Sequence, residues 1–251
     1  NLNCFDDIKN YIADRRSAAD ILEFNQTINS LCLCDPAVGS GHFLVSALNE
    51  LIAVKYELGI LADSTGTRVR DFELTIENDE LIVTNESGDL FEYRVRGGRP
   101  IGSEAQRLQK TLFHEKQNII ENCLFGVDIN PKSVLICRLR LWIELLKNAY
   151  YREESNFREL ETLPNIDINI KCGNSLISRY ALDADIKTAL KKSKWTIDSY
   201  RLAVMTYRNA HSKDEKREMQ RLIDAIKSDF VMEISANDKR LLRKKRLEGD
   251  L

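Results

Sequence analysis

Three short apolar runs, at residues 31–35, 123–128 and 166–172, each end in polar residues that predict a turn. After the first two runs, over 43–61 and 131–149, apolar residues recur every three or four positions, as they do along a helix. This alternation of strand and helix is typical of a parallel sheet covered by helices. The sequence therefore predicts the α/β fold class.

The helix expected over 131–149 has a clear start, with Asn130 as its cap and Pro131 at its first position. Its apolar residues lie on nearly every side, at Val134, Leu135, Cys137, Leu139, Leu141, Trp142, Leu145 and Leu146. Such a pattern predicts a helix packed between layers.

Residues 62–100 interrupt this alternation. Three short stretches of strand character, at 69–76, 81–83 and 91–95, are separated by turn residues. We therefore expect an inserted antiparallel meander of three strands, followed by a helix over 103–122.

Beyond residue 183 the pattern is helical, with a break expected at 209–212. Residues 191–251 hold 16 Lys and Arg against 10 Asp and Glu, whereas the whole chain holds 37 against 39 and has a net charge of −2. We divide the chain into an α/β part over 1–190 and a helical, basic extension over 191–251. An anionic partner would meet this extension; a solvated helix rich in Lys and Arg is the alternative.

Length and composition exclude several classes of protein. The apolar runs are too short to span a bilayer, and the first residues form no signal peptide, so no membrane partner is expected. The six cysteines form no CxxC pair and the three histidines are scattered, which disfavours a metal site. A reducing, cytoplasmic compartment fits this pattern.

The turns after the apolar runs carry the candidate chemistry. In an open parallel sheet, ligands bind beyond the carboxyl ends of the strands, where glycine turns and helix N-termini leave backbone N–H groups free. Gly39 and Gly41 let the backbone approach a ligand closely. Asp128 could accept hydrogen bonds from both hydroxyls of a ribose, and Asn174 could offer its amide to an adenine ring.

Asp35 determines which ligand charge is expected. The turn reads GSGHFL, without the third glycine of a dinucleotide fingerprint, and a carboxylate at its mouth would repel a pyrophosphate. The same carboxylate would attract a cationic amino-acid group. S-adenosylmethionine combines a ribose, an adenine and a positive end, so it is the expected cofactor.

Three segments also carry a family resemblance. DPAVGSGHFL at 35–44 resembles motif I of the amino-methylating DNA methyltransferases, LFGVDINP at 124–131 resembles motif II, and IKCGNSL at 170–176 resembles motif III. The nearest match is to the large bacterial restriction-modification methylases, over roughly residues 30–180. The resemblance implies an adenine-specific enzyme with a Rossmann-like class I methyltransferase sheet. The expected fold is this sheet together with the inserted β meander and the helical C-terminal extension that the residue pattern predicts.

The resemblance also implies a role for each motif residue. Asp35 would neighbour the methionine ammonium group, and the pocket around the methionine half would be shaped by Pro36, Ala37, Gly39 and Gly41. Asp128 would bind the ribose, and Ile129 would pack on the adenine. Asn174, with Ser175 and Leu176 beside it, would face the adenine amino group. Many relatives have Asp at Asn174, but an amide oxygen accepts the same hydrogen bond.

The residues that would hold the target base are missing. The family flips its base into a pocket built on Asn/Asp/Ser-Pro-Pro-Tyr/Phe, called motif IV. The four prolines of this chain, Pro36, Pro100, Pro131 and Pro164, are never adjacent. The upstream Tyr/Phe-Thr-Pro motif is also not found, and the chain starts at Asn1. We therefore expect a fragment that has no catalytic residue, is inactive alone and lacks the flanking catalytic and target-recognition domains.

Other interpretations remain open. Singly, the motif residues are commonly helix caps or turn formers, and Phe43 and Ile129 would ordinarily be core residues. As a whole, the chain could be a non-catalytic cofactor-binding or scaffold module, or part of a methyltransferase that acts on RNA or a small molecule. The partner of the parent enzyme is expected to be double-stranded DNA, and the basic cluster at 239–246 could contact it. The inserted segment at 62–122 could be a lid or a packing platform.

Overall fold

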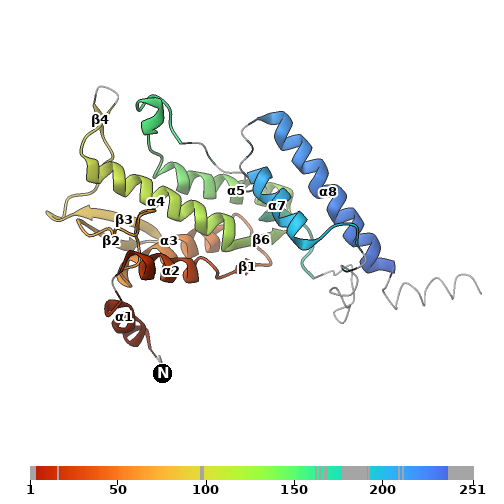
Figure 1. Cartoon of the computed structure of the whole chain (residues 1–251), viewed down its shortest axis with the longest axis horizontal. Helices are drawn as coiled ribbons and strands as arrows, with labels where there is room; N and C mark the ends of the chain where they lie inside the picture. The colour runs from red at the N-terminus through yellow and green to blue at the C-terminus, as the bar shows by residue number, and fades with distance from the viewer. Residues whose placement is uncertain are drawn as a thin grey trace, which may run out of the picture. The chain divides into compact units, whose positions relative to one another are not determined.

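The computed structural model describes residues 4–15, 17–96, 99–161, 163, 166, 169–176, 191, 193–208, 210 and 212–236. The structure is mixed α/β (Figure 1) and divides into two compact units, Asn1–Gly173 and Asn174–Leu251. The boundary predicted between 190 and 191 stays a prediction, because residues 177–190 lie outside the described part of the chain.

The predicted parallel sheet is present in the first unit. Its strands, in their order across the sheet, are β1 (Leu33–Asp35), β6 (Leu124–Asp128) and β7 (Ile170–Cys172). Both pairs are parallel, and their register places Asp35 beside Gly126 and Asp128 beside Cys172. The carboxyl ends of the strands therefore meet at one edge, and Asp35 and Asp128 are each the last residue of a strand.

Three helices form the main core with this sheet (Figure 1). They are α3 (His42–Glu57), α4 (Ser103–Asn122) and α5 (Pro131–Leu146). α3 follows β1 and α5 follows β6, as predicted, and the helix expected over 103–122 has those bounds. The fully buried side chains of this core include Leu44, Leu48, Ile52, Leu112, Phe113, Ile119, Leu124, Leu141, Leu145 and Ile170.

Helix α5 buries only part of its surface. Its buried apolar residues are Val134, Cys137, Leu141 and Leu145, spaced by three or four, whereas its exposed apolar residues are Leu135, Ile136, Leu139, Ile143 and Leu146. The prediction of a helix packed between layers is wrong, because α3, α4, β6 and β7 leave that apolar surface uncovered.

The insertion begins with an antiparallel hairpin of β2 (Phe72–Glu77) and β3 (Glu80–Asn85). Its two turn residues, Asn78 and Asp79, have φ angles of 52° and 66°. This left-handed conformation suits a two-residue hairpin turn, and Asn and Asp tolerate it better than most residues. The first two strands of the predicted meander are therefore confirmed.

The third strand of the meander is not formed. Leu90 makes a single bridge to Thr84, after which β4 (Val95–Arg96) pairs with β5 (Arg99–Pro100) instead. The intervening Tyr93 is drawn towards α4, because its hydroxyl donates to Gln106 Oε1 at 2.5 Å. That side-chain hydrogen bond competes with continued strand pairing.

Besides β5, three helical elements have no counterpart in the sequence prediction. They are α1 (Phe5–Ala13), α2 (Ala18–Ile28) and the 3₁₀ helix η1 (Glu153–Ser155). α2 has a regular start, since the Ser17 side chain accepts a hydrogen bond from the Asp20 N–H. Within the described residues, no helix has both the length and the apolar character that crossing a membrane requires.

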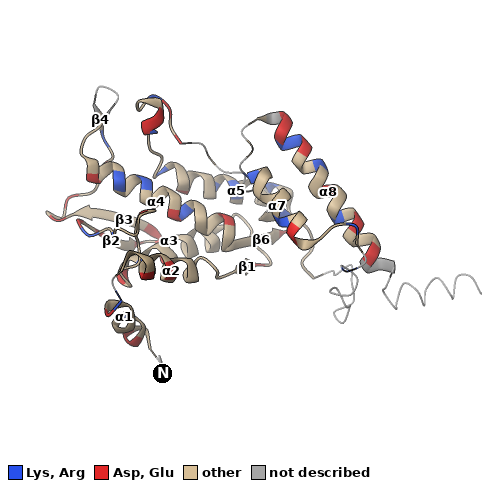
Figure 2. Cartoon of the chain, in the orientation of Figure 1, with Lys and Arg blue, Asp and Glu red and all other residues tan. Residues whose placement is uncertain are grey.

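The second unit contains α7 (Ile197–Arg208) and α8 (Lys213–Ala236), whose bounds lie on either side of the predicted break at 209–212. These helices pack through apolar residues that include Ala203, Tyr207, Ile223 and Ile226. Basic and acidic residues are mixed along α8 (Figure 2), as on a solvated helix. The basic cluster at 239–246 lies outside the described residues.

Candidate functional site

The glycine turn after β1 leaves one side of Asp35 available. The Ala37 N–H donates to Asp35 Oδ1 at 3.0 Å, and the Val38 N–H donates to the Val127 carbonyl at 2.9 Å. Among the described residues, none donates a hydrogen bond to Asp35 Oδ2. Pro36 and Ala37 are exposed at the same edge of the sheet. The carboxylate therefore stabilises its own turn through one oxygen and could meet a cation with the other.

The two glycines of the turn have different structural roles. Gly41 (φ 82°) is the cap of α3, and a Cβ there would lie 2.5 Å from Cys137 Sγ, so the residue lets α3 approach α5. At Gly39 (φ 51°) a Cβ would meet only the Ala37 carbonyl, at 4.0 Å. Gly39 therefore leaves open space beside the backbone, where a ligand could lie.

Asp128 connects the turn after β1 with the turn after β6. Its Oδ2 accepts a hydrogen bond from the Gly39 N–H at 2.9 Å, and its Oδ1 accepts one from the Asn130 N–H at 2.7 Å. Each carboxylate oxygen has capacity for a further hydrogen bond. The same side chain can thus hold both turns and still receive hydroxyl groups.

The thiol of Cys137, on α5, has a raised pKa. Burial, followed by the charge of Asp35, raises the pKa of Cys137 to about 11. The thiol therefore stays protonated near neutral pH and serves as an apolar neighbour of Gly41.

Gly126 is a structural residue of the site that the sequence analysis did not single out. It is buried in β6, and a Cβ there would lie 2.8 Å from Cγ2 of Val38, which is only 4% exposed. The absence of a side chain lets the glycine turn pack onto the neighbouring strand. A glycine inside an apolar strand was the available signal.

Two apolar side chains beside the turns are exposed. Phe43, at the start of α3, is 56% exposed, and Ile129, directly after Asp128, is 72% exposed. The interpretation of these residues as core is therefore wrong. An exposed apolar side chain next to Asp128 could pack against a planar ring.

The third motif is only partly placed. The Gly173 N–H donates to the Asp128 carbonyl at 2.9 Å, which extends the pairing of β6 and β7. Asn174 Oδ1 accepts a hydrogen bond from the Leu176 N–H at 2.9 Å. Asn174, Ser175 and Leu176 belong to the second unit, so their predicted position beside Asp128 stays a prediction.

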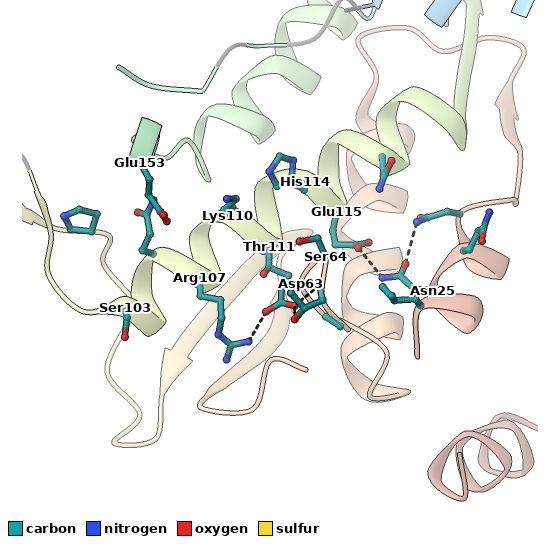
Figure 3. A pocket seen from close by; sticks show the side chains of 18 of the residues that line it. Asn25, Asp63, Ser64, Ser103, Arg107, Lys110, Thr111, His114, Glu115 and Glu153 are labelled. Carbon is teal, nitrogen blue, oxygen red and sulfur yellow. Dashed lines mark hydrogen bonds and ion pairs between the residues drawn. The ribbon is translucent and has the colours of Figure 1, made fainter. Parts of the chain in front are cut away.

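A separate pocket of about 1310 Å³ lies along α4 and is lined by residues from α2, α4 and adjoining loops (Figure 3). None of the predicted site residues lines it. One of its walls contains an ion pair between Glu115 and Lys55, whose side chain is fully buried. Burial lowers the pKa of Lys55, while the charge and hydrogen bond of Glu115 oppose this effect.

Comparison with known proteins now identifies the chain. Residues 11–245 match the family described as the MmeI DNA-methyltransferase domain. The chain belongs to this family. The matched range of this MmeI-type domain contains all three predicted motif segments, with Asp35, Asp128 and Asn174.

One curated relative adds a second comparison. It is a protein of Methanocaldococcus jannaschii that is provisionally named a type II restriction enzyme and methyltransferase, and it is 28% identical over 225 residues. The match covers 88% of this chain but only 15% of the length of the relative. No solved structure matches the chain. Together, the two matches identify a methyltransferase domain of the restriction-modification type.

Proposed function

We propose that this MmeI-type domain binds S-adenosylmethionine at the carboxyl edge of β1, β6 and β7, for methylation of the exocyclic amino group of adenine in double-stranded DNA. The observation that carries the proposal is the 2.9 Å hydrogen bond from the Gly39 N–H to Asp128 Oδ2. It joins the glycine turn to the acid that would bind the ribose. The parallel order β1-β6-β7 supports a Rossmann-like class I arrangement.

The residues of the glycine turn fit the methionine half of the cofactor. Asp35 would attract the ammonium group through Oδ2, while Oδ1 keeps its hydrogen bond to Ala37. Pro36, Ala37, Gly39 and Gly41 would shape the surrounding pocket, and the open space beside Gly39 lets the backbone come close to the ligand. When bound, S-adenosylmethionine supplies a methyl group on a positively charged sulfur.

The residues after β6 and β7 fit the nucleoside half. Asp128 would accept hydrogen bonds from the ribose hydroxyls with its remaining lone pairs. The exposed Ile129 would pack on the adenine, and Asn174 would accept a hydrogen bond from the adenine amino group, with Ser175 and Leu176 beside it. No described residue is assigned a role in methyl transfer itself, because motif IV is not found in the sequence.

Calorimetric titration of the full chain with S-adenosylmethionine tests the proposal. Asp128→Asn keeps one acceptor oxygen but loses the charge and the second acceptor, so we expect a Kd weaker by about 10- to 100-fold, as for lost hydrogen bonds to a charged group. Asp71→Asn is the matched control, because Asp71 is exposed and lies outside the site. No binding by the folded wild-type chain, or equal affinity of Asp128→Asn, would contradict the proposal.

A further inference from the structure

The turn of the inserted β2–β3 hairpin is attached to the first half of α3. Asp79 Oδ1 accepts a hydrogen bond from the Ser46 hydroxyl at 2.9 Å, and Asp79 Oδ2 lies 3.4 Å from His42 Nε2. The Asp79 backbone carbonyl accepts another from Asn49 Nδ2 at 2.8 Å. His42, Ser46 and Asn49 are spaced by four and three, so they share one face of the helix.

This attachment reaches the glycine turn through His42, the first residue of α3. The cap of α3 is Gly41, which has no side chain to accept a hydrogen bond from the first N–H groups of the helix. No side chain at the cap position therefore accepts a hydrogen bond from these N–H groups. In this chain, the side chain of Asp79, a residue of the hairpin turn, contacts the side chains of His42 and Ser46 in the first two turns of α3.

We propose that Asp79 is a positioning residue for the glycine turn, so that the inserted hairpin increases affinity for the cofactor. The inference rests on the proposed binding of S-adenosylmethionine. Asp79 contacts α3, and Gly41 is the cap directly before the first residue of that helix. Two residues before Gly41, Gly39 donates to Asp128. The insertion therefore acts as a support of the site.

The hairpin offers a matched control for this role. Glu80, the next residue, pairs with Lys147 at 3.4 Å, just beyond the end of α5. Glu80→Ala removes an attachment of the same hairpin without touching the start of α3. Asp79→Gly removes the carboxylate and creates Asn-Gly, a sequence favoured in a two-residue hairpin turn, so the turn itself is kept.

The experiment measures two quantities in the full chain: amide hydrogen exchange over residues 39–46 and the Kd for S-adenosylmethionine. We expect Asp79→Gly to accelerate exchange and to weaken binding, each by about 3- to 10-fold, as for one or two lost hydrogen bonds of ordinary strength. Asp79→Asn should restore part of both, because its amide oxygen can still accept from Ser46. Glu80→Ala should change neither.

Two results with Asp79→Gly would overturn the positioning role: unchanged exchange over residues 39–46, or faster exchange with an unchanged Kd. The double variant Asp79→Gly/Ser46→Ala should be no weaker than Asp79→Gly alone, because both changes remove the same hydrogen bond. Failure of the wild-type chain to bind S-adenosylmethionine is a different result. It would refute the proposed function, and the positioning role with it, even if exchange responded as expected.

Discussion

At the scale of single residues, the two carboxylates proposed to bind the cofactor also stabilise the fold. Asp35 and Asp128 each accept hydrogen bonds from the backbone of their own turns, at 3.0 and 2.7 Å. These bonds fix the carboxylates before any ligand arrives, so less conformational entropy is lost on binding. Gly39 and Gly41 contribute through positive φ angles and the space left by a missing Cβ.

Asp35 should recognise the amino-acid half of the cofactor. Asp35→Asn keeps the oxygen that accepts from Ala37 but removes the charge, so S-adenosylmethionine should bind about tenfold more weakly. 5′-Methylthioadenosine has the same nucleoside but no amino-acid group, so its affinity should be unchanged. Calorimetry with both ligands checks this, and an equal loss for the two would show that Asp35 supports the turn rather than the ammonium group.

At the scale of elements, a buried polar network connects α2, α3 and α4. Lys55 Nζ donates to Asn25 Oδ1 and Asn29 Oδ1, both at 2.7 Å, and to Glu115 Oε2 at 2.5 Å. Asn25 Nδ2 in turn donates to Glu115 Oε1 at 2.7 Å. Because the pair is satisfied on both sides, it can be buried without a lone charge.

Breaking this network on one side should destabilise the fold. Lys55→Met leaves Glu115 as an uncompensated buried charge, which costs about 3–5 kcal/mol of unfolding free energy. Adding Glu115→Gln removes that charge and keeps an acceptor for Asn25, so the double variant should be more stable than Lys55→Met. Urea denaturation followed by circular dichroism measures both, with the partly exposed Lys110→Met as control. A double variant less stable than Lys55→Met would contradict this account.

At the scale of the whole molecule, the chain contains the three segments proposed to bind the cofactor but no Pro-Pro pair. Methyl transfer to a base requires that the base be held outside the duplex, which takes stacking and hydrogen-bonding groups in addition to a cofactor site. Binding and catalysis should therefore be separable in this chain. The family match establishes the methyltransferase domain, and the cofactor and the adenine target remain our proposal.

We expect the 251-residue chain to bind S-adenosylmethionine without methylating DNA. The chain should be stabilised against heat by the cofactor, since a ligand that binds the folded state raises the unfolding temperature. With S-adenosylmethionine labelled in its methyl group, no label should enter duplex DNA, whereas an active adenine methyltransferase assayed alongside should label it. Labelled adenine in DNA treated with this chain would refute the inactivity, and labelled RNA would favour the alternative acceptor.

Local patterns predicted the elements whose signals are contained in a few neighbouring residues. β1, β6 and α4 were predicted from apolar spacing, and the start of α5 from Asn130 and Pro131, because strand period, helix period and caps are short-range properties. α1 and α2 were missed, although Ser17 and Asp20 form a readable start for α2. The missing third meander strand depends on Tyr93 and Gln106, whose hydrogen bond no local pattern reveals.

The sequence by itself determined the α/β class, the glycine turn and the acids that end two strands. Each of these features depends on a pattern of neighbouring residues, which can be recognised without the tertiary structure. Only the tertiary structure decided that Gly39 donates to Asp128, that Gly126 makes room for Val38 and that Asp79 holds the start of α3. These contacts join residues 33 to 89 positions apart. Their existence depends on how strands, helices and the inserted hairpin pack, which is a property of the folded chain.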